Sequence, residues 1–282
     1  MIDAHNSQHP TAIRAMCARC RSTYESFRHG GMVNPGGACL GWRPVDSAGI
    51  AGPYVWVTYA EALARVDALH AAFAARGALA SNEDGMPLLA IYMKNCPEWV
   101  LAEQACFAGR GATVPLYDTL GPATVEFVLK QTGCATVVCG GATEALRVLS
   151  VAAQCPRLKL VVVVDPRADC GAISCEAAGA VEVVAFGVLE GEGLTVAAPP
   201  KHVPPQPHDI ATFCYTSGGN PRCPLAPTLP RAHGVDRRRG FSSPRARCVA
   251  LLQRRDDGRP EGRADQPRQP DRGSGQPGSG RV

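Results

Sequence analysis

Residues 88–116, LLAIYMKNCPEWVLAEQACFAGRGATVPL, place a helical segment between two apolar runs of strand length. The first run, 88–93, is followed by Asn95, which can cap a helix, and by Pro97, which is tolerated in a first helical turn. The second run, 113–116, comes after a glycine-containing turn. A strand, a helix and a strand in this order are typical of a parallel β-sheet joined by crossover helices.

The same alternation continues on both sides of this unit. Upstream, Thr58 and Glu61 form a capping box at a helix start, and His70 lies on the apolar face of that helix, where a packed core histidine is expected. Further strands are predicted at 136–139, 160–164, 181–185 and 210–215, with helices that begin at Pro122 and Ala142. Because these runs are almost continuously apolar, we expect an α/β fold with a parallel sheet covered by helices on both faces. Ligands of such sheets bind at the carboxyl ends of the strands.

The 13 cysteines are odd in number and scattered along 282 residues, so a disulfide framework is not indicated. Most lie inside apolar runs, where cysteine behaves as a small hydrophobic residue, and a reducing compartment fits this usage. Cys17 and Cys20 form a CxxC pair without a second pair downstream, and no metal site is predicted. No apolar run approaches the roughly 20 residues of a membrane span, and the first residues do not resemble a secretory signal.

The charge divides the chain near residue 218. Residues 1–218 carry 15 Lys and Arg against 19 Asp and Glu, a net charge of −4, whereas residues 219–282 carry 14 Arg and 6 acidic residues, a net charge of +8. Arg, Pro and Gly supply 32 of these last 64 residues. We therefore predict an N-terminal segment (1–23), a folded domain (24–218) and a disordered basic tail (219–282). The segment 197–205, rich in proline, is expected to be a stiff, exposed connector.

The last predicted strand, 210–215, opens into hydroxyl and glycine residues. Glycines let backbone N–H groups approach phosphate oxygens, and hydroxyl groups add donors or hold a metal ion. A plain turn is the alternative, and the pattern is not that of a P-loop NTPase. The candidate phosphate-binding residues are Thr216, Ser217, Gly218 and Gly219.

Residues 214–218, CYTSG, resemble the beginning of the phosphate loop of adenylate-forming enzymes, which reads YTSGTTGxPKG. Upstream segments resemble those of long-chain fatty acyl-CoA synthetases in the same order along the chain. These segments are CLGWRP at 39–44, GPYVWVTY at 52–59, NCPEW at 95–99 and VPLYDTLGP at 114–122. Four ordered matches are more specific than any single motif.

The resemblance implies a partial N-terminal domain of the adenylate-forming fold. It also implies a long-chain fatty acid–CoA ligase, which converts ATP, a fatty acid and CoA into acyl-CoA, AMP and pyrophosphate. Residues 216–219 would then bind ATP together with Mg²⁺, whereas Trp99, Tyr117 and Asp118 are interpreted as scaffold. By the same resemblance the protein is expected in the cytoplasm or at the cytoplasmic face of the endoplasmic reticulum, with peripheral rather than transmembrane association.

The resemblance ends after Gly218. Arg222 stands where the family has a lysine, the later segments for adenine and ribose are missing, and residues 219–282 contain no lysine for adenylation. Because Arg, Pro and Gly share GC-rich codons, we hypothesise that the tail is read in a shifted frame and that the chain is inactive as a ligase. The alternatives are a non-catalytic remnant or an interaction module, with a basic tail that binds nucleic acid or anionic lipid. Phe241 is the tail's single aromatic residue, which disfavours binding to nucleic acid.

Overall fold

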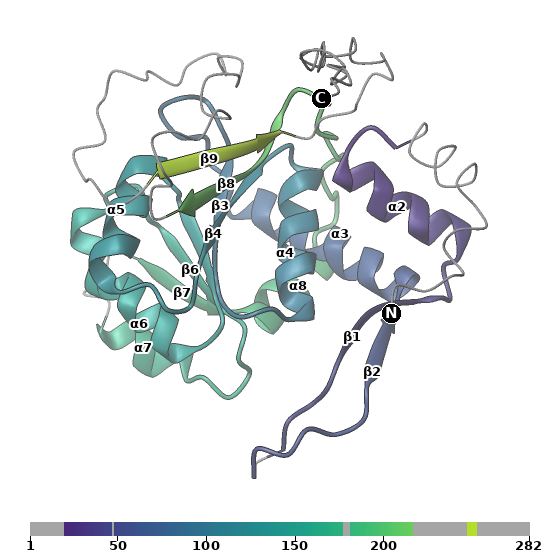
Figure 1. Ribbon diagram of the computed structural model, residues 1–282, viewed down its shortest axis with the longest axis horizontal. Coiled ribbons are helices and arrows are strands. Elements are labelled where there is room, and N and C mark those ends of the chain that lie inside the picture. Colours follow the sequence, from purple (N-terminus) through teal and green to yellow (C-terminus); the bar gives the residue numbers. More distant parts are fainter. Residues whose placement is uncertain (1–19, 47, 177–180, 217–246, 253–282) are drawn as a thin grey trace, which may run out of the picture.

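Strand β3 (Leu88–Tyr92) lies in the middle of a seven-stranded sheet, and all of its residues are buried. The structure is a computed structural model that describes residues 20–46, 48–176, 181–216 and 247–252. The order across the sheet is β7-β6-β5-β3-β4-β8-β9 (Figure 1). The other strands are β4 (Ala112–Leu116), β5 (Thr136–Cys139), β6 (Leu160–Val163), β7 (Glu182–Ala185), β8 (Ile210–Thr216) and β9 (Arg247–Leu252). Strands β3 to β8 are parallel, which confirms the predicted fold class.

The direction of each crossover decides which face its helix covers. The helices are α2 (Thr23–Val33), α3 (Tyr59–Ala75), α4 (Pro97–Ala108), α5 (Pro122–Thr132), α6 (Ala142–Ser150), α7 (Cys170–Glu176) and α8 (Phe186–Leu194). The chain crosses the sheet in one direction through α4 and α8, and in the other direction through α5, α6 and α7. Because crossovers between parallel strands are right-handed, helices whose crossovers run in opposite directions cover opposite faces of the sheet (Figure 1). Among the described residues, none of these helices combines the length and apolar content that crossing a membrane requires.

Two separate cores result, and β3 contributes to both. Leu88, Ala90 and Tyr92 face the core beneath α5, α6 and α7. Leu89 and Ile91 face the core beneath α3, α4 and α8. This alternation is the period-two pattern of a strand whose faces are both buried.

The structure confirms the predicted start of α3 and corrects the start of α4. The Thr58 hydroxyl accepts from the Glu61 amide at 3.3 Å, and the Thr58 amide donates to the Glu61 carboxylate at 2.8 Å. At α4, the predicted cap by Asn95 is wrong, because Cys96 is the N-cap residue and makes no side-chain capping bond. Pro97 is the first helical residue, and a residue before proline is held in the extended conformation that an N-cap requires. The cap position is therefore fixed by the proline.

Cysteine burial follows the expectation in the cores. Cys106, Cys134 and Cys139 are buried free thiols, and burial raises the pKa of Cys134 to about 12. These side chains act as small hydrophobic residues, as predicted. Cys214 is half-buried, and Cys17 lies outside the described residues.

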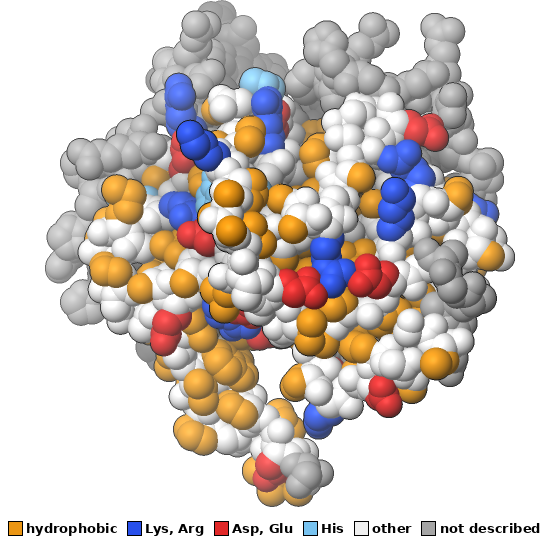
Figure 2. All heavy atoms as spheres, turned by 180° about the vertical axis from the view of Figure 1, so that it is seen from behind, with side chains coloured by type: hydrophobic (Ala, Val, Ile, Leu, Met, Phe, Trp, Pro, Cys, Tyr) orange, Lys and Arg blue, Asp and Glu red, His pale blue; other side chains and the backbone are white. Residues whose placement is uncertain are grey.

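A hairpin that was not predicted projects from the body. It consists of β1 (Ala38–Trp42) and β2 (Val55–Thr58), which pair in antiparallel fashion (Figure 1). The loop satisfies its own polar groups: Arg43 donates to the carbonyls of Gly52 and Ala51 at 2.7 and 2.9 Å. Apolar side chains gather on the projecting lobe in Figure 2, and the exposed ones are Val45, Ile50, Tyr54, Val55 and Trp56.

Strand β9 adds an antiparallel edge to the sheet beside β8. It lies inside the segment 219–282, for which we predicted disorder, so the structure differs from that prediction at residues 247–252. The sequence RCVALL is apolar at five of six positions, and pairing satisfies backbone groups that β8 would otherwise expose. The rest of the tail and its predicted boundary at residue 218 lie outside the described residues.

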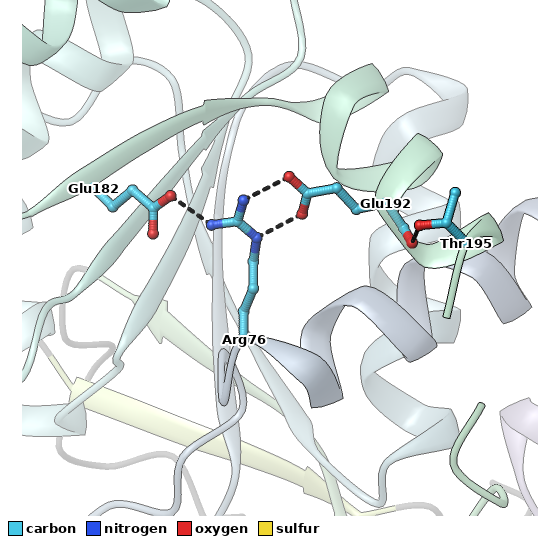
Figure 3. A network of polar contacts seen from close by, with 4 residues as sticks. All are labelled: Arg76, Glu182, Glu192 and Thr195. Carbon is cyan, nitrogen blue, oxygen red and sulfur yellow. Dashed lines mark hydrogen bonds and ion pairs between the residues drawn. The ribbon is translucent and has the colours of Figure 1, made fainter. Parts of the chain in front are cut away.

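An arginine at the end of α3 ties this helix to two other elements (Figure 3). Arg76 donates to both carboxylate oxygens of Glu192 on α8, at 2.8 and 2.7 Å, and to Glu182 on β7 at 2.5 Å. Arg65 makes a second bidentate pair with Glu190, at 2.7 and 3.1 Å. Planar guanidinium groups suit such two-point pairing with carboxylates, so α8 is held in register along α3.

Candidate functional site

The predicted phosphate loop begins where β8 leaves the carboxyl edge of the sheet. Thr212 of β8 lies opposite Thr113 of β4, and the Thr212 hydroxyl donates to the Thr113 carbonyl at 3.2 Å. Thr216 is the last residue of β8. Of the predicted site residues, Ser217, Gly218 and Gly219 lie outside the described residues. The structure therefore gives the point at which β8 ends, beside the segment that follows β4.

That neighbouring segment, residues 117–121, is held in place from behind by a chain of hydrogen bonds. Arg147 on α6 donates to the carbonyl of Asp118 at 3.0 Å and to the Tyr92 hydroxyl at 3.2 Å. The Tyr92 hydroxyl in turn donates to the carbonyl of Leu120 at 2.6 Å. The hydrogen bond with Tyr92 raises the pKa of Arg147 above its ordinary value. These hydrogen bonds hold residues 117–121 in a fixed position beside the end of β8.

Two tyrosine side chains, one of them from β8 itself, connect the end of β8 to neighbouring elements. The Tyr117 hydroxyl lies 3.5 Å from the sulfur of Cys214, and this contact raises the pKa of Tyr117. The Tyr215 hydroxyl donates to the side chain of Gln131 at 2.9 Å, and its ring meets Phe127 edge-on at 6.3 Å. Successive residues of β8 are therefore held by the 117–121 segment and by α5.

The residues that were interpreted as scaffold lie in three different settings. Trp99 packs, partly buried, against the core beneath α3, α4 and α8. Tyr117 is 53% exposed at the carboxyl edge. Asp118 has its carboxylate 3.8 Å from Lys94, a residue that is itself 84% exposed, so solvent screens this pair. Tyr117 and Asp118 thus belong to the edge at which the loop begins, and Trp99 does not.

The entry to β8 is fixed as firmly as its end. Arg110 donates to both carboxylate oxygens of Asp209, at 2.7 and 3.1 Å, and the Gln206 amide donates to the same carboxylate at 2.7 Å. Burial raises the pKa of Asp209, but the hydrogen bonds from Arg110 and Gln206 outweigh it and leave the pKa below its usual value. Both ends of β8 are therefore anchored.

The connector that leads to β8 is less exposed than predicted. The His202 side chain is 20% exposed, and Pro205 is buried. The Val203 amide donates to the carbonyl of Ala108 at the end of α4, at 2.8 Å. The prediction of an exposed connector is therefore wrong at His202 and Pro205, whereas Val203 is 53% exposed.

The residues that hold the 117–121 segment and β8 were not predicted as parts of the site. Arg147 lies on an amphipathic helix whose sequence has no motif that marks a site. Asp209 and His202 lie in the proline-containing segment between α8 and β8. The sequence carries no local signal for their partners, which lie far away along the chain. Within the part of the chain that the structure describes, no group of three or more His, Cys, Asp or Glu is placed to hold a metal ion.

The parallel sheet and its flanking helices resemble solved structures of adenylation domains. The adenylation domain of a carboxylate reductase from Mycobacterium chelonae superposes with a TM-score of 0.59 at 19% identity, covering 73% of this chain and 34% of that one. This likeness shows the fold. A family model described as AMP-binding enzyme matches residues 41–221, and the chain belongs to that family.

Relatives in the family resemble this chain over most of its length. A long-chain-fatty-acid–CoA ligase 1 of Cavia porcellus is 34% identical over 207 residues, which cover 72% of this chain and 28% of the relative. A peroxisomal long chain acyl-CoA synthetase 6 of Arabidopsis thaliana is 37% identical over 191 residues, covering 65% of this chain and 25% of the relative. The resemblance drawn from the sequence motifs is confirmed. The chain spans little more than a quarter of the length of these relatives.

Proposed function

We propose that this chain binds the phosphates of ATP at residues 216–219 and supplies the N-terminal part of a long-chain fatty acid–CoA ligase. The observation that carries the proposal is the position of β8. This strand runs parallel beside β4 and ends with Thr216 at the carboxyl edge, within the residues that match the family model. Ligands of parallel sheets bind at this edge.

The chemistry of the loop residues suits a triphosphate. Backbone N–H groups of Gly218 and Gly219 would approach phosphate oxygens, and the hydroxyls of Thr216 and Ser217 would donate to them or hold Mg²⁺. Bound Mg²⁺ would neutralise charge as pyrophosphate leaves. The fatty acid would thereby be activated as an acyl-adenylate, from which CoA takes the acyl group as a thioester.

Anchoring of β8 supports this role. A phosphate site gains from donors that are already fixed before the ligand arrives, because less conformational freedom is lost on binding. The contacts of Arg110 with Asp209 and of Tyr215 with Gln131 fix the two ends of the strand that delivers the loop.

We propose further that the 282-residue chain, taken alone, binds nucleotide without completing the ligation. The family match ends at residue 221, and the residues that follow lack a lysine for adenylation. Residence in the cytoplasm or at the cytoplasmic face of the endoplasmic reticulum, and peripheral membrane association, are part of the same proposal.

Calorimetric titration of the full chain with ATP and Mg²⁺ tests the binding site. We expect the double variant Thr216→Val, Ser217→Ala to bind at least about tenfold more weakly, because hydrogen bonds to charged groups contribute about 1.5–3 kcal/mol each. Thr195→Ala is the matched control, since this hydroxyl caps α8 through the Glu192 carbonyl, away from β8. Equal affinity in both variants, or no binding by the unaltered chain, would overturn the site.

A second assay tests the absence of turnover. Release of AMP from ATP in the presence of palmitate and CoA is expected to stay at the background of a no-enzyme control. Turnover by the 282-residue chain that is lost in the double variant would contradict the proposal of binding alone and would support a complete ligase site.

A further inference from the structure

Five polar side chains from three distant segments meet at the connector that leads to β8. Tyr24 and Arg28 come from α2, Asp67 and His70 from α3, and His202 from the connector between α8 and β8. None of them takes part in the proposed phosphate site.

His202 is the centre of this cluster. Its Nδ1 atom lies 2.8 Å from the Tyr24 hydroxyl, and its Nε2 atom lies 3.5 Å from a carboxylate oxygen of Asp67. Its ring meets the ring of His70 edge-on, with 4.7 Å between the centroids. The next amide along the chain, that of Val203, donates to Ala108 at the end of α4. Residues 202 and 203 of the connector thus contact α2, α3 and α4.

The contacts of His202 suit a neutral imidazole. With the proton assigned to Nε2, the N–H faces the Asp67 carboxylate, and Nδ1 accepts the hydrogen of the Tyr24 hydroxyl. A second proton on Nδ1 would force the Tyr24 hydroxyl to turn from donor to acceptor and to find another acceptor for its own hydrogen. Tyr24 is only 8% exposed, so its hydroxyl has little access to water as a replacement acceptor. Protonation therefore opposes the closed arrangement.

His70 adds a second buried imidazole. It is 5% exposed, and neither ring nitrogen has a hydrogen-bond partner within 3.5 Å. Its surroundings from α4 are apolar or backbone groups, including Gly109, where an added Cβ would lie 3.4 Å from the ring. An imidazolium in this position would be a buried charge, and the backbone of Ala105, which favours the protonated form, does not outweigh that burial.

The charges that face the two histidines cannot compensate a second or third cation. Asp67 supplies one negative charge, and Arg28 already pairs with it. Arg28 also lies 5.4 Å above the ring of Tyr24. Burial raises the pKa of the Tyr24 hydroxyl, and the negative charges of Asp67 and Glu25 act in the same direction while Arg28 opposes them. With one carboxylate shared between a permanent cation and two imidazoles, positive charge accumulates as the histidines take up protons.

The pKa directions agree with this geometry. Burial lowers the pKa of His70, and the neighbouring His202 lowers it further. Burial also lowers the pKa of His202, as does Arg28, while Asp67 acts in the opposite direction without reversing the shift. Both histidines therefore bind protons more weakly in the closed arrangement than in water.

We propose that His202 and His70 form a pH-sensitive latch, which holds the connector against α2, α3 and α4 at neutral pH and releases it when the imidazoles are protonated. Since each pKa is lowered in the closed state, the open state binds more protons. The contribution of the latch is complete above about pH 6.5, the ordinary pKa of histidine, and is lost as the pH falls below that value. The connector continues directly into β8, so opening would loosen the strand that carries the proposed phosphate loop.

Hydrogen–deuterium exchange of the full chain, corrected for the intrinsic effect of pH, tests the latch. Between pH 7.5 and pH 5.5 we expect exchange of the Val203 amide to accelerate by up to about tenfold for each histidine that takes up a proton on opening. Amides of β3 should remain protected. Unchanged protection of the connector, or simultaneous loss of protection in β3, would overturn a local latch.

Two variants and a control sharpen the test. His202→Gln removes one of the two titrating groups, and the pH dependence of connector exchange should become weaker. The control His208→Gln alters a histidine that is 78% exposed and should keep the pH dependence. Tyr24→Phe keeps the ring but removes the hydroxyl that opposes protonation, so the midpoint of opening should rise toward pH 6.5. A pH dependence in His202→Gln as steep as in the unaltered chain, or an unchanged midpoint in Tyr24→Phe, would overturn the proposal.

The consequence for ATP rests on the proposed function, and the exchange experiment does not. If the connector opens with pH while ATP fails to bind at any pH, the proposed function fails and the latch stands. If ATP binds with the expected affinity and the connector does not respond to pH, the latch fails alone.

Discussion

Arg110 and Asp209, which are 99 residues apart in the chain, form a two-point ion pair at the entry of β8. Arg110 also has a positive φ of 57°, which is unfavourable for a residue with a Cβ atom. The ion pair thus holds a side chain on a backbone position that would otherwise suit glycine. This relationship makes the turn after α4 and the start of β8 one structural unit.

Replacement of Arg110 separates the ion pair from the backbone conformation. Arg110→Ala removes the pair and keeps the unfavourable φ, whereas Arg110→Gly removes the pair and relieves the backbone. We expect the alanine variant to be the less stable of the two by about 1 kcal/mol in urea denaturation. Equal stability of the two variants would show that the positive φ carries no cost here.

Gly193 on α8 permits the close approach of α8 to α3. An added Cβ would lie 1.8 Å from the carbonyl oxygen of Ala68, so Gly193→Ala must push the helices apart. We expect a loss of about 2–3 kcal/mol in the free energy of unfolding. Gly187→Ala and Gly191→Ala are matched controls on the same helix, because nothing lies within 4 Å of their added Cβ. These controls should be stabilised by about 0.5–1 kcal/mol, since alanine favours the helix. A Gly193→Ala variant as stable as the controls would contradict the close contact between α8 and α3.

The pair between Arg76 and Glu192 predicts a defined acid sensitivity. Hydrogen bonds from Arg76 lower the pKa of Glu192 below its ordinary value of 4.5. A carboxylate with a lowered pKa stabilises the fold above its ordinary pKa, and this contribution is lost as the pH falls below about 4.5. In Glu192→Gln the pH dependence of the unfolding midpoint below pH 5 should be shallower. Glu182→Gln should change it less, because that side chain is 60% exposed and receives one bond from Arg76.

The projecting hairpin is expected to promote self-association of the isolated chain. Val45 and Ile50 are 59% and 66% exposed, and the hairpin presents other apolar side chains beside them. The variant Val45→Thr, Ile50→Thr should remain monomeric to higher concentration in sedimentation velocity, with an unchanged thermal midpoint. A control that alters the exposed Val188 and Leu194 of α8 to Thr and Gln tests whether any exposed apolar pair has the same effect. If both variants remain monomeric to the same higher concentration, self-association does not depend on the hairpin in particular.

Local signals in the sequence predicted most elements of the sheet, and long-range contacts limited the rest. The capping box of Thr58 and Glu61 and the buried run of β3 depend on neighbouring residues, and both predictions are confirmed. The contact of Tyr24 with His202 joins residues 178 positions apart, and no local pattern reports it. The hairpin was missed because its short strands are separated by a long irregular loop. The loop at 216–219 remains a prediction beyond Thr216.

The position of β8 also has a consequence for the order in which the chain is made. β8 emerges from the ribosome after β3 to β7, yet it pairs with β4, about a hundred residues earlier. Until then β4 is an edge strand with unpaired backbone groups. Closing so long a loop is slow compared with pairing of neighbouring strands. The strand that carries the proposed phosphate loop is therefore the last of the parallel strands β3 to β8 to be added, and during synthesis the exposed edge of β4 is where the nascent chain is most open to wrong pairing.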